Sequence, residues 1–314
     1  MKHRVEYVAV AAVGAIARRL PDAWVRAWGS ALGLAFYVVD RSHRRVALAN
    51  LERCFPSRSA AERRALARAT FRHFGRALLQ MLTFSALADE DRAARVEFEG
   101  VEHVEIAYAR GRGVFFFTGH FGFWELHAIA HGHRFEPIGV VARMLDNPYL
   151  HEMLERVRQR TGNHVIYRQG AVRKIMKTLS GGHGVAVLID QHMHSADAVW
   201  VSFFQRPAAT TSALAALALR TGASVIPVFA LPLPEGRFRF VYEPPVTPPA
   251  GSDAAATHEF TQRCTDVLEM YVRRHPELWL WMHRRWRDSP AEKRGMFPTA
   301  RPDSSDDTAL EAQP

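Results

Sequence analysis

The sequence predicts an α/β domain with a central, mostly parallel sheet covered by helices. Short, continuous apolar runs such as residues 114–117 have the composition of strands that are buried on both faces. Segments with apolar residues at helical spacing separate these runs, which is the alternation that parallel strands with crossover helices produce. With 314 residues, of which 48% are hydrophobic and 23% charged, the chain is long enough to form one large core.

The helices are predicted from capping residues and apolar periodicity. Ser59 with Glu62 is a capping box, and it predicts a helix that extends to about residue 79. Asn147 followed by Pro148 marks another helix start, with Asn as N-cap and Pro in the first turn. Further helices are expected near residues 121–130, 172–179, 211–220 and 260–271.

The strands are predicted from apolar runs that are too short for helices. They are expected at residues 114–117, 138–142, 185–189, 224–230 and 237–242. The last of these alternates between apolar and polar residues, which indicates an edge strand. Asp190 directly follows the third strand, at a sheet end where polar groups often line a site.

Two short apolar segments lie near the N-terminus. Residues 7–17 are fewer than the roughly 20 that a spanning helix needs. Trp24 and Trp28 precede the second segment, residues 31–39, and arginines flank the first, which suits a membrane interface. We therefore expect residues 1–40 to form an N-terminal helical membrane anchor, whether spanning the bilayer or lying on it. The alternative is a pair of ordinary helices packed on the domain.

The composition limits the partners and the compartment. The net charge of +9 and an isoelectric point near 10.0 favour acidic partners such as anionic lipids, phosphorylated substrates or an acidic carrier protein. Cys54 and Cys264 are far apart and form no disulfide framework, which fits a reducing compartment.

The main domain is expected at residues 41–295. Residues 296–314 are rich in Pro, Ser, Asp and Ala and are expected to be disordered.

The most informative segment is residues 118–125, where a histidine lies between a buried strand and a helix. Glu125 follows His120 by five residues, so its side chain is expected to reach back to the imidazole ring. Acyl transfer to a hydroxyl group needs a base with a pKa near neutrality, and a carboxylate can fix the tautomer of that base. Gly119 and Gly122 are expected to let the backbone approach a substrate. The alternative is a helix-capping histidine with Glu125 on the surface.

Several segments, in this order along the chain, resemble the lipid A late acyltransferases, the lauroyl and myristoyl transferases of the lysophospholipid-acyltransferase superfamily. His120 and Glu125 match the His-x4-Asp/Glu box of that superfamily. The resemblance extends over roughly residues 5–290. Gln205 departs from it, because the family often has glycine there. The other matching segments are residues 50–56, Arg143 with residues 146–148, Asp190 with Gln191, residues 203–211 and residues 281–286.

The resemblance implies a catalytic pair, His120 and Glu125, that works without a metal or cofactor. It implies an acyl-carrier protein, or acyl-coenzyme A, as donor and a glycolipid acceptor such as a lipid A precursor, at the cytoplasmic face of the inner membrane. A phosphatidylinositol mannoside or a lysophospholipid is an alternative acceptor. Which arginine contacts the acceptor phosphate stays open. The expected substrate-binding residues are Arg143, Asn147, Arg158, Arg160, Arg168, Asp190 and Gln191.

Two alternatives come from other classes of protein. His127 and His131 have the spacing of zinc ligands on a helix, which would suit a zinc-dependent hydrolase. The high isoelectric point would suit a nucleic-acid-binding protein. The basic residues are spread along the chain, however, and the aromatic residues lie mostly in apolar runs, which disfavours a nucleic-acid-binding surface.

Overall fold

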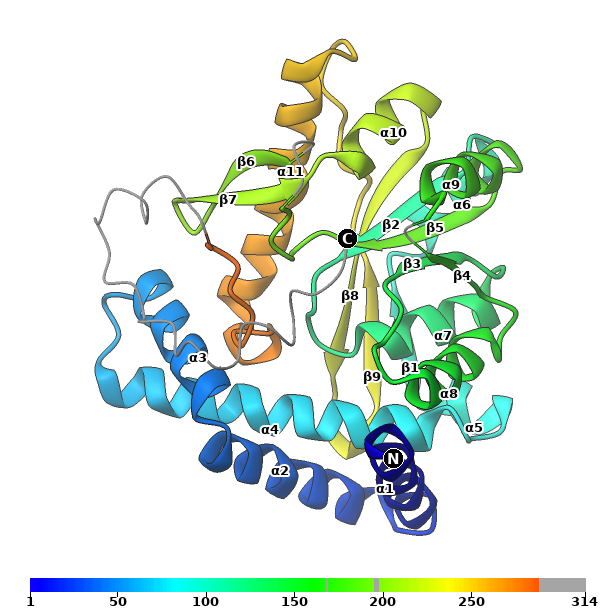
Figure 1. Cartoon of the computed structure of the whole chain (residues 1–314). Coiled ribbons are helices and arrows are strands. Elements are labelled where there is room, and N and C mark those ends of the chain that lie inside the picture. The colour runs from blue at the N-terminus through cyan, green and yellow to red at the C-terminus, as the bar shows by residue number, and fades with distance from the viewer. Residues whose placement is uncertain (168, 195–197, 288–314) are drawn as a thin grey trace.

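A seven-stranded sheet forms the centre of the computed structural model, which describes residues 1–167, 169–194 and 198–287 (Figure 1). The strand order is β1-β9-β8-β2-β5-β3-β4, and β2, β3, β4, β5 and β8 run parallel. This confirms the predicted α/β fold. The tail expected at residues 296–314 lies outside the described residues. The strands are β1 (Val96–Glu99), β2 (Val114–Thr118), β3 (Gly139–Ala142), β4 (His164–Tyr167), β5 (Gly184–Leu188), β8 (Ser224–Pro232) and β9 (Phe238–Tyr242).

Strand β9 is not at the edge of the sheet, so the edge-strand prediction for residues 237–242 is wrong. It runs antiparallel to β8 on one side and parallel to β1 on the other. Its residues alternate because Arg239 lies beside Glu97 of β1, with 3.3 Å between the guanidinium nitrogen and a carboxylate oxygen. A polar pair between neighbouring strands thus produced the same pattern as exposure to solvent.

Helices cover both faces of the sheet. The ring of Phe116 in β2 contacts Tyr108 of α6 and His131 of α7, whereas Phe115 packs with Leu214 of α10 on the other face. Successive strand residues point to opposite faces, so β2 contributes to both cores. The helices of the sheet domain are α5 (Asp89–Ala94), α6 (Val101–Ala109), α7 (Trp124–Arg134), α8 (Pro148–Gln159), α9 (Ala171–Ser180), α10 (Ala213–Thr221) and α11 (Ala254–Arg274).

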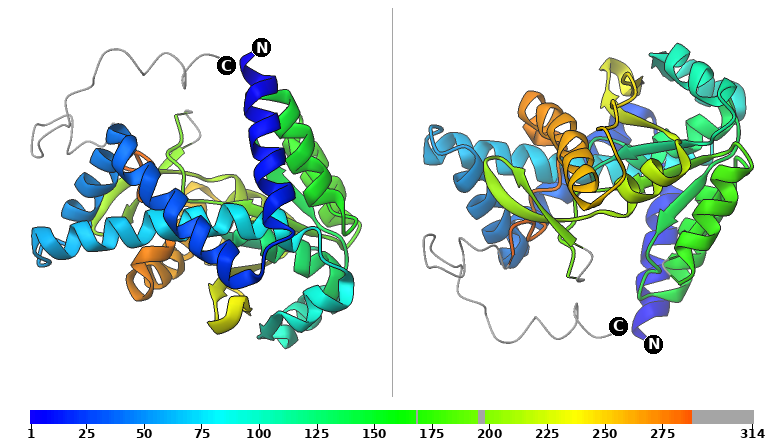
Figure 2. Two further views of the ribbon diagram at one scale, coloured as in Figure 1. Left: turned by 90° about the horizontal axis from the view of Figure 1, so that it is seen from below. Right: turned by 90° about the horizontal axis from the view of Figure 1, so that it is seen from above.

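Four helices precede the sheet: α1 (Lys2–Ala17), α2 (Asp22–Val39), α3 (Arg41–Cys54) and α4 (Ala60–Phe84). The capping box of Ser59 and Glu62 begins α4, as predicted. Helices α2 and α4 cross closely because glycine is present at the crossing: a Cβ atom on Gly33 would lie 2.0 Å from the carbonyl oxygen of Phe71. Helix α1 packs against α8 (Figure 2). Among the residues that the structure describes, no helix combines the length and apolarity needed to cross a bilayer.

A hairpin of β6 (Ala198–Phe203) and β7 (Arg206–Thr211) packs on α11 outside the main sheet. Its two turn residues, Phe204 and Gln205, both have positive φ values, 54° and 57°. Glycine adopts such angles without steric cost, so the glycine that the resemblance implies at position 205 would suit this turn. Two short 3-10 helices, η1 (Pro234–Gly236) and η2 (Pro276–Leu278), complete the described elements.

Candidate active site

His120 lies in a turn between β2 and α7, at the carboxyl end of the central strand. Helix α7 begins at Trp124, not near Phe121 as predicted, and the intervening turn is held by the C-terminal segment of the chain. The amide of Leu280 donates to the carbonyl of His120 at 3.0 Å, and the amide of Gly122 donates to the carbonyl of Leu278 at 2.9 Å. These bonds replace the helical ones and fix the backbone of His120.

The carboxylate of Asp190 holds both the ring and the backbone of His120. One oxygen lies 2.8 Å from Nδ1, and the other accepts the backbone amide of His120 at 2.7 Å and the indole N–H of Trp279 at 2.9 Å. Because an ionised carboxylate can only accept hydrogen bonds, Nδ1 must carry a proton. In the neutral ring Nε2 is then left with a free lone pair, the state of a general base.

The electrostatics of this pair favour charge separation. Burial alone opposes protonation of His120, but the charge and hydrogen bond of Asp190, with a smaller effect from Glu125, raise the pKa of His120 above its ordinary value. Burial likewise opposes ionisation of Asp190, yet the contacts with His120 lower the pKa of Asp190 to about 2. Asp190 is therefore ionised at neutral pH and stabilises an imidazolium on His120.

Glu125 does not hold the ring of His120, contrary to the prediction. Its two carboxylate oxygens accept hydrogen bonds from Nε and Nη2 of Arg158, at 3.0 and 2.5 Å. Glu125 is in the first turn of α7 and Arg158 is in the last turn of α8, and these helices pack together, so the two side chains meet between them. Such bidentate pairs are strong and fix the orientation of the guanidinium plane.

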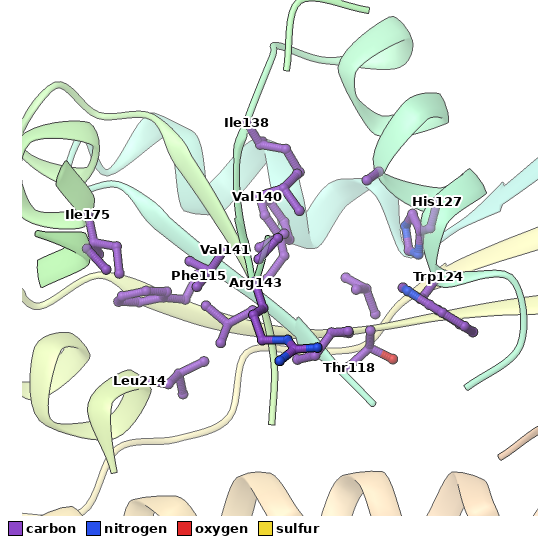
Figure 3. A pocket seen from close by; sticks show the side chains of 18 of the residues that line it. Phe115, Thr118, Trp124, His127, Ile138, Val140, Val141, Arg143, Ile175 and Leu214 are labelled. Carbon is purple, nitrogen blue, oxygen red and sulfur yellow. The ribbon is translucent and has the colours of Figure 1, made fainter. Parts of the chain in front are cut away.

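A cavity of about 590 Å³ opens beside His120, Glu125 and Arg158. This volume is in the range of roughly 300–1,000 Å³ that is typical of small-molecule sites. Figure 3 shows that its lining comes from both faces of the sheet, with Ile138 and His127 on the α7 side and Ile175 and Leu214 on the α9 and α10 side. Strands β3 and β5 pair only over two residues, which leaves a gap at their carboxyl ends. Most of the lining residues are apolar.

The two glycines of the turn are required by the protein's own packing, and their role in the approach of a substrate stays a prediction. A Cβ atom on Gly119 would lie 2.8 Å from a carboxylate oxygen of Asp190. Gly122 has φ +59°, and a Cβ atom there would lie 1.9 Å from the carbonyl oxygen of Ala230. Any side chain at position 119 would therefore push Asp190 away from His120.

The expected substrate-binding residues differ in their placement. Arg143, Arg158 and Gln191 line the cavity, and the amide nitrogen of Gln191 lies 3.5 Å from Nε2 of His120. Arg143 is exposed at the cavity's edge and pairs with Asp146 at 3.5 Å. Arg160 donates to the carbonyl of Ser85, away from the cavity. Arg168 lies outside the described residues.

Asn147 is occupied by contacts within the protein. Its side-chain oxygen caps α8 by accepting the amides of Tyr149 and Leu150, as predicted for an N-cap. Its side-chain nitrogen donates to the carbonyl of His3 and the carboxylate of Glu6, both on α1. The buried Asn147 side chain thus joins two helices and has no part in lining the cavity.

Trp279 and Arg285 support the site, and neither was predicted to do so from the sequence. Trp279 binds Asp190, and the buried guanidinium of Arg285 donates to the carbonyls of Gln191 at 3.2 Å and Ala209 at 2.5 Å. Arg285 belongs to the segment 281–286 that resembles the family, whereas Trp279 precedes it. The close succession of tryptophans at positions 279, 281 and 286 is the available signal.

The helical histidines that suggested zinc are engaged in aromatic packing. His131 uses both ring nitrogens, at 2.9 Å from the Tyr242 hydroxyl and 3.2 Å from the Tyr108 hydroxyl. His127 stacks on Phe240, and burial lowers its pKa to about 3, so it is neutral. Within the described residues no group of three or more His, Cys, Asp or Glu side chains is placed to hold a metal ion.

The parallel sheet and its His-x4-Glu turn beside an apolar cavity define an acyltransferase. The chain belongs to the bacterial lipid A biosynthesis acyltransferase family, whose model matches residues 1–288. It is 28% identical over 274 residues to the lipid A biosynthesis lauroyltransferase of Escherichia coli K12, covering 87% of this chain and 88% of that one. It is also 26% identical over 247 residues to the myristoyltransferase of the same strain (78% and 75% covered) and 28% identical over 257 residues to its palmitoleoyltransferase (80% and 81%).

Proposed function

We propose that the protein transfers a fatty acyl chain from the thioester of acyl-carrier protein to a hydroxyl group of a lipid A precursor. The observation that supports this most directly is the state of His120. Its Nδ1 is tied to a buried carboxylate, and the ring lines an apolar cavity that suits an acyl chain. The names of the similar proteins supply the acceptor, since each acts in lipid A biosynthesis.

In the proposed reaction, Nε2 of His120 takes the proton of the acceptor hydroxyl as its oxygen attacks the thioester carbonyl. The tetrahedral intermediate then collapses, the carbon–sulfur bond breaks, and the imidazolium returns its proton to the sulfur. Asp190 stabilises the imidazolium through the 2.8 Å hydrogen bond to Nδ1. The step forms one ester and one free thiol, and it needs no covalent enzyme intermediate.

We assign Glu125 the task of positioning Arg158. The guanidinium uses Nε and Nη2 to bind the carboxylate, which leaves Nη1 for another partner. Because Arg158 lines the cavity beside His120, a cation held there would stabilise the oxyanion of the intermediate or bind a phosphate of the acceptor. In this assignment Glu125 acts through Arg158, and Asp190 orients the base.

We further propose that residues 1–40 bind the cytoplasmic face of the inner membrane and that residues 41–295 carry the catalytic domain. Helix α1 exposes Val5, Val8, Val13 and Ile16, which repeat at helical spacing on one side. Exposed apolar stripes of this kind lie in the headgroup region of a bilayer. The lipid substrate would then reach the cavity without leaving the membrane surface.

The test is acyl transfer by purified protein in mixed micelles of a neutral detergent, with acyl-carrier protein charged with a fatty acid and a lipid A precursor. Mass spectrometry identifies the product. His120→Ala is expected to lose transfer while remaining folded, and replacement of His133, an exposed histidine at the far end of α7, by Ala is the matched control. Equal rates for His120→Ala and wild type would disprove the mechanism. Acylation of a lysophospholipid or a mannoside in place of the precursor would reassign the acceptor.

A further inference from the structure

The outward face of α2 consists only of apolar side chains. Every exposed side chain between residues 23 and 39 is Ala, Val, Leu, Phe or Trp, and the largest are Trp24 and Trp28, which are 59% and 48% exposed. Small side chains alone would be unremarkable on a surface, but large aromatic ones in a continuous stripe are costly in water. This face therefore needs a partner, and tryptophan is the residue that is enriched at bilayer interfaces.

A row of arginines runs along α4 beside this helix. Arg64, Arg68, Arg72 and Arg76 recur every four residues, so they lie on one side of α4. Helices α2 and α4 lie side by side (Figure 1), and Arg72 and Arg76 line a groove between them together with Ala31 and Leu34 of α2. The groove thus has a wall from α2 that is apolar except for Ser30, and a wall from α4 that carries the cations.

The cations of the groove are not neutralised within the described part of the chain. None of the four arginines forms a salt bridge with a described carboxylate, and Glu277 is the acidic residue that lines the groove. Burial, followed by the charges of Arg72 and Arg26, lowers the pKa of Arg76, and Glu277 offsets this only in part. A cluster of like charges with so little compensation is stabilised by an anion from outside the protein.

We propose that the groove between α2 and α4 binds the phosphate group of an anionic phospholipid while the apolar face of α2 lies in the same bilayer. Guanidinium groups match phosphate oxygens in geometry as well as in charge. A free phosphate ion would satisfy the charges but not the adjoining tryptophan stripe, so the lipid is the better match. The inference rests on the proposed membrane association, and it adds a preference for anionic lipids and the residues that carry it.

The experiment is co-sedimentation of the full chain with vesicles of phosphatidylcholine alone and with vesicles that also contain phosphatidylglycerol. The variant Arg72→Gln/Arg76→Gln should bind the mixed vesicles about 30-fold more weakly, which corresponds to about 2 kcal/mol for two basic residues at an anionic surface. Its binding to phosphatidylcholine should stay as in wild type. The matched control is Arg110→Gln/Arg112→Gln, which removes the same charge at the exposed turn between α6 and β2 and should bind like wild type.

An equal loss in both double variants would show a diffuse charge effect and would overturn the proposal, as would a wild type that binds both kinds of vesicle equally. If the double variant melts early, the single variant Arg72→Gln decides, since Arg72 is exposed. Its loss of binding free energy for the mixed vesicles should be roughly half of that expected for the double variant. Trp28→Ser should weaken binding to both kinds of vesicle, and an unchanged value would contradict membrane association itself. No acyl donor is present, so the outcome is independent of the proposed reaction.

Discussion

Replacing Asp190 by Asn separates the role of this carboxylate in catalysis from its role in the fold. Three donors meet the carboxylate: the backbone amide and Nδ1 of His120 on opposite oxygens, and the indole of Trp279 on the same oxygen as the amide. An asparagine has one oxygen and one NH₂ group. With its oxygen toward the backbone N–H of His120 and the indole N–H of Trp279, the asparagine satisfies two donors. In the opposite orientation both of these donors face the NH₂ group, which cannot accept from them.

The asparagine of the Asp190→Asn variant would therefore turn its NH₂ group toward Nδ1 of His120. Nδ1 must then accept, so the ring proton moves to Nε2, and the nitrogen beside the cavity can no longer take a proton from a hydroxyl. The same tautomer error in a serine protease lowers kcat about 10⁴-fold, and we expect a similar loss here. That factor corresponds to about 5 kcal/mol in the activation free energy.

The assay is the steady-state rate in neutral-detergent micelles, with thermal unfolding measured in parallel. The fold should persist, because two of the three hydrogen bonds remain and the third re-forms with the NH₂ group donating to Nδ1. The loss of the charge from these hydrogen bonds is expected to cost about 1–3 kcal/mol in unfolding free energy. Asp190→Glu is a useful companion, since it keeps the charge but adds a methylene group in a packed site. A kcat for Asp190→Asn within tenfold of wild type would refute the assignment of Asp190 as the group that orients His120.

Three other outcomes are expected. Glu125→Ala should lower kcat by roughly 10²–10³-fold, because Arg158 loses the carboxylate that fixes it, while Glu125→Asp should stay partly active; rates in micelles check this. The buried, neutral His73 and His127 have pKa values lowered to about 4 and about 3, so the unfolded chain alone takes up protons as the pH falls below about 6.5. Stability should thus fall between pH 6.5 and pH 5 by about 2 kcal/mol for each, and an unchanged urea midpoint at pH 5 would contradict this. Removing residues 1–40 should move the protein from the membrane pellet to the supernatant, which fractionation shows.

The sequence predicted the strands that are buried on both faces, because their apolar runs are continuous. It did not predict β1 and β4, because charged or polar residues in these four-residue strands interrupt the apolar run, whereas the equally short β3 is continuously apolar. The hairpin of β6 and β7 was also missed. The burial of β6 depends on α11, which packs against it, and that contact is between segments far apart in the chain.

The partner of His120 shows the limit of reasoning from sequence spacing. Glu125 is five residues away and was the natural candidate, yet Asp190 is 70 residues away in sequence and in direct contact. Strands β2 and β5 are neighbours in the sheet, so the residues that follow them meet at the same edge. Asp190 was recognised as a strand-end residue, but its contact with His120 depended on the strand order, which apolar periodicity does not determine.

The contacts of Asn147 give the N-terminal helix a mechanical link to the mouth of the cavity. The side chain caps α8, which begins directly after the loop that carries Arg143 and Leu145, and both of these line the cavity. The same side chain binds α1 through His3 and Glu6. A movement of α1 is therefore transmitted to the rim of the cavity through the Asn147 amide group and through the hydrogen bond from Arg4 to the Tyr149 hydroxyl. The helix for which we propose membrane contact is thereby coupled mechanically to the entrance of the cavity.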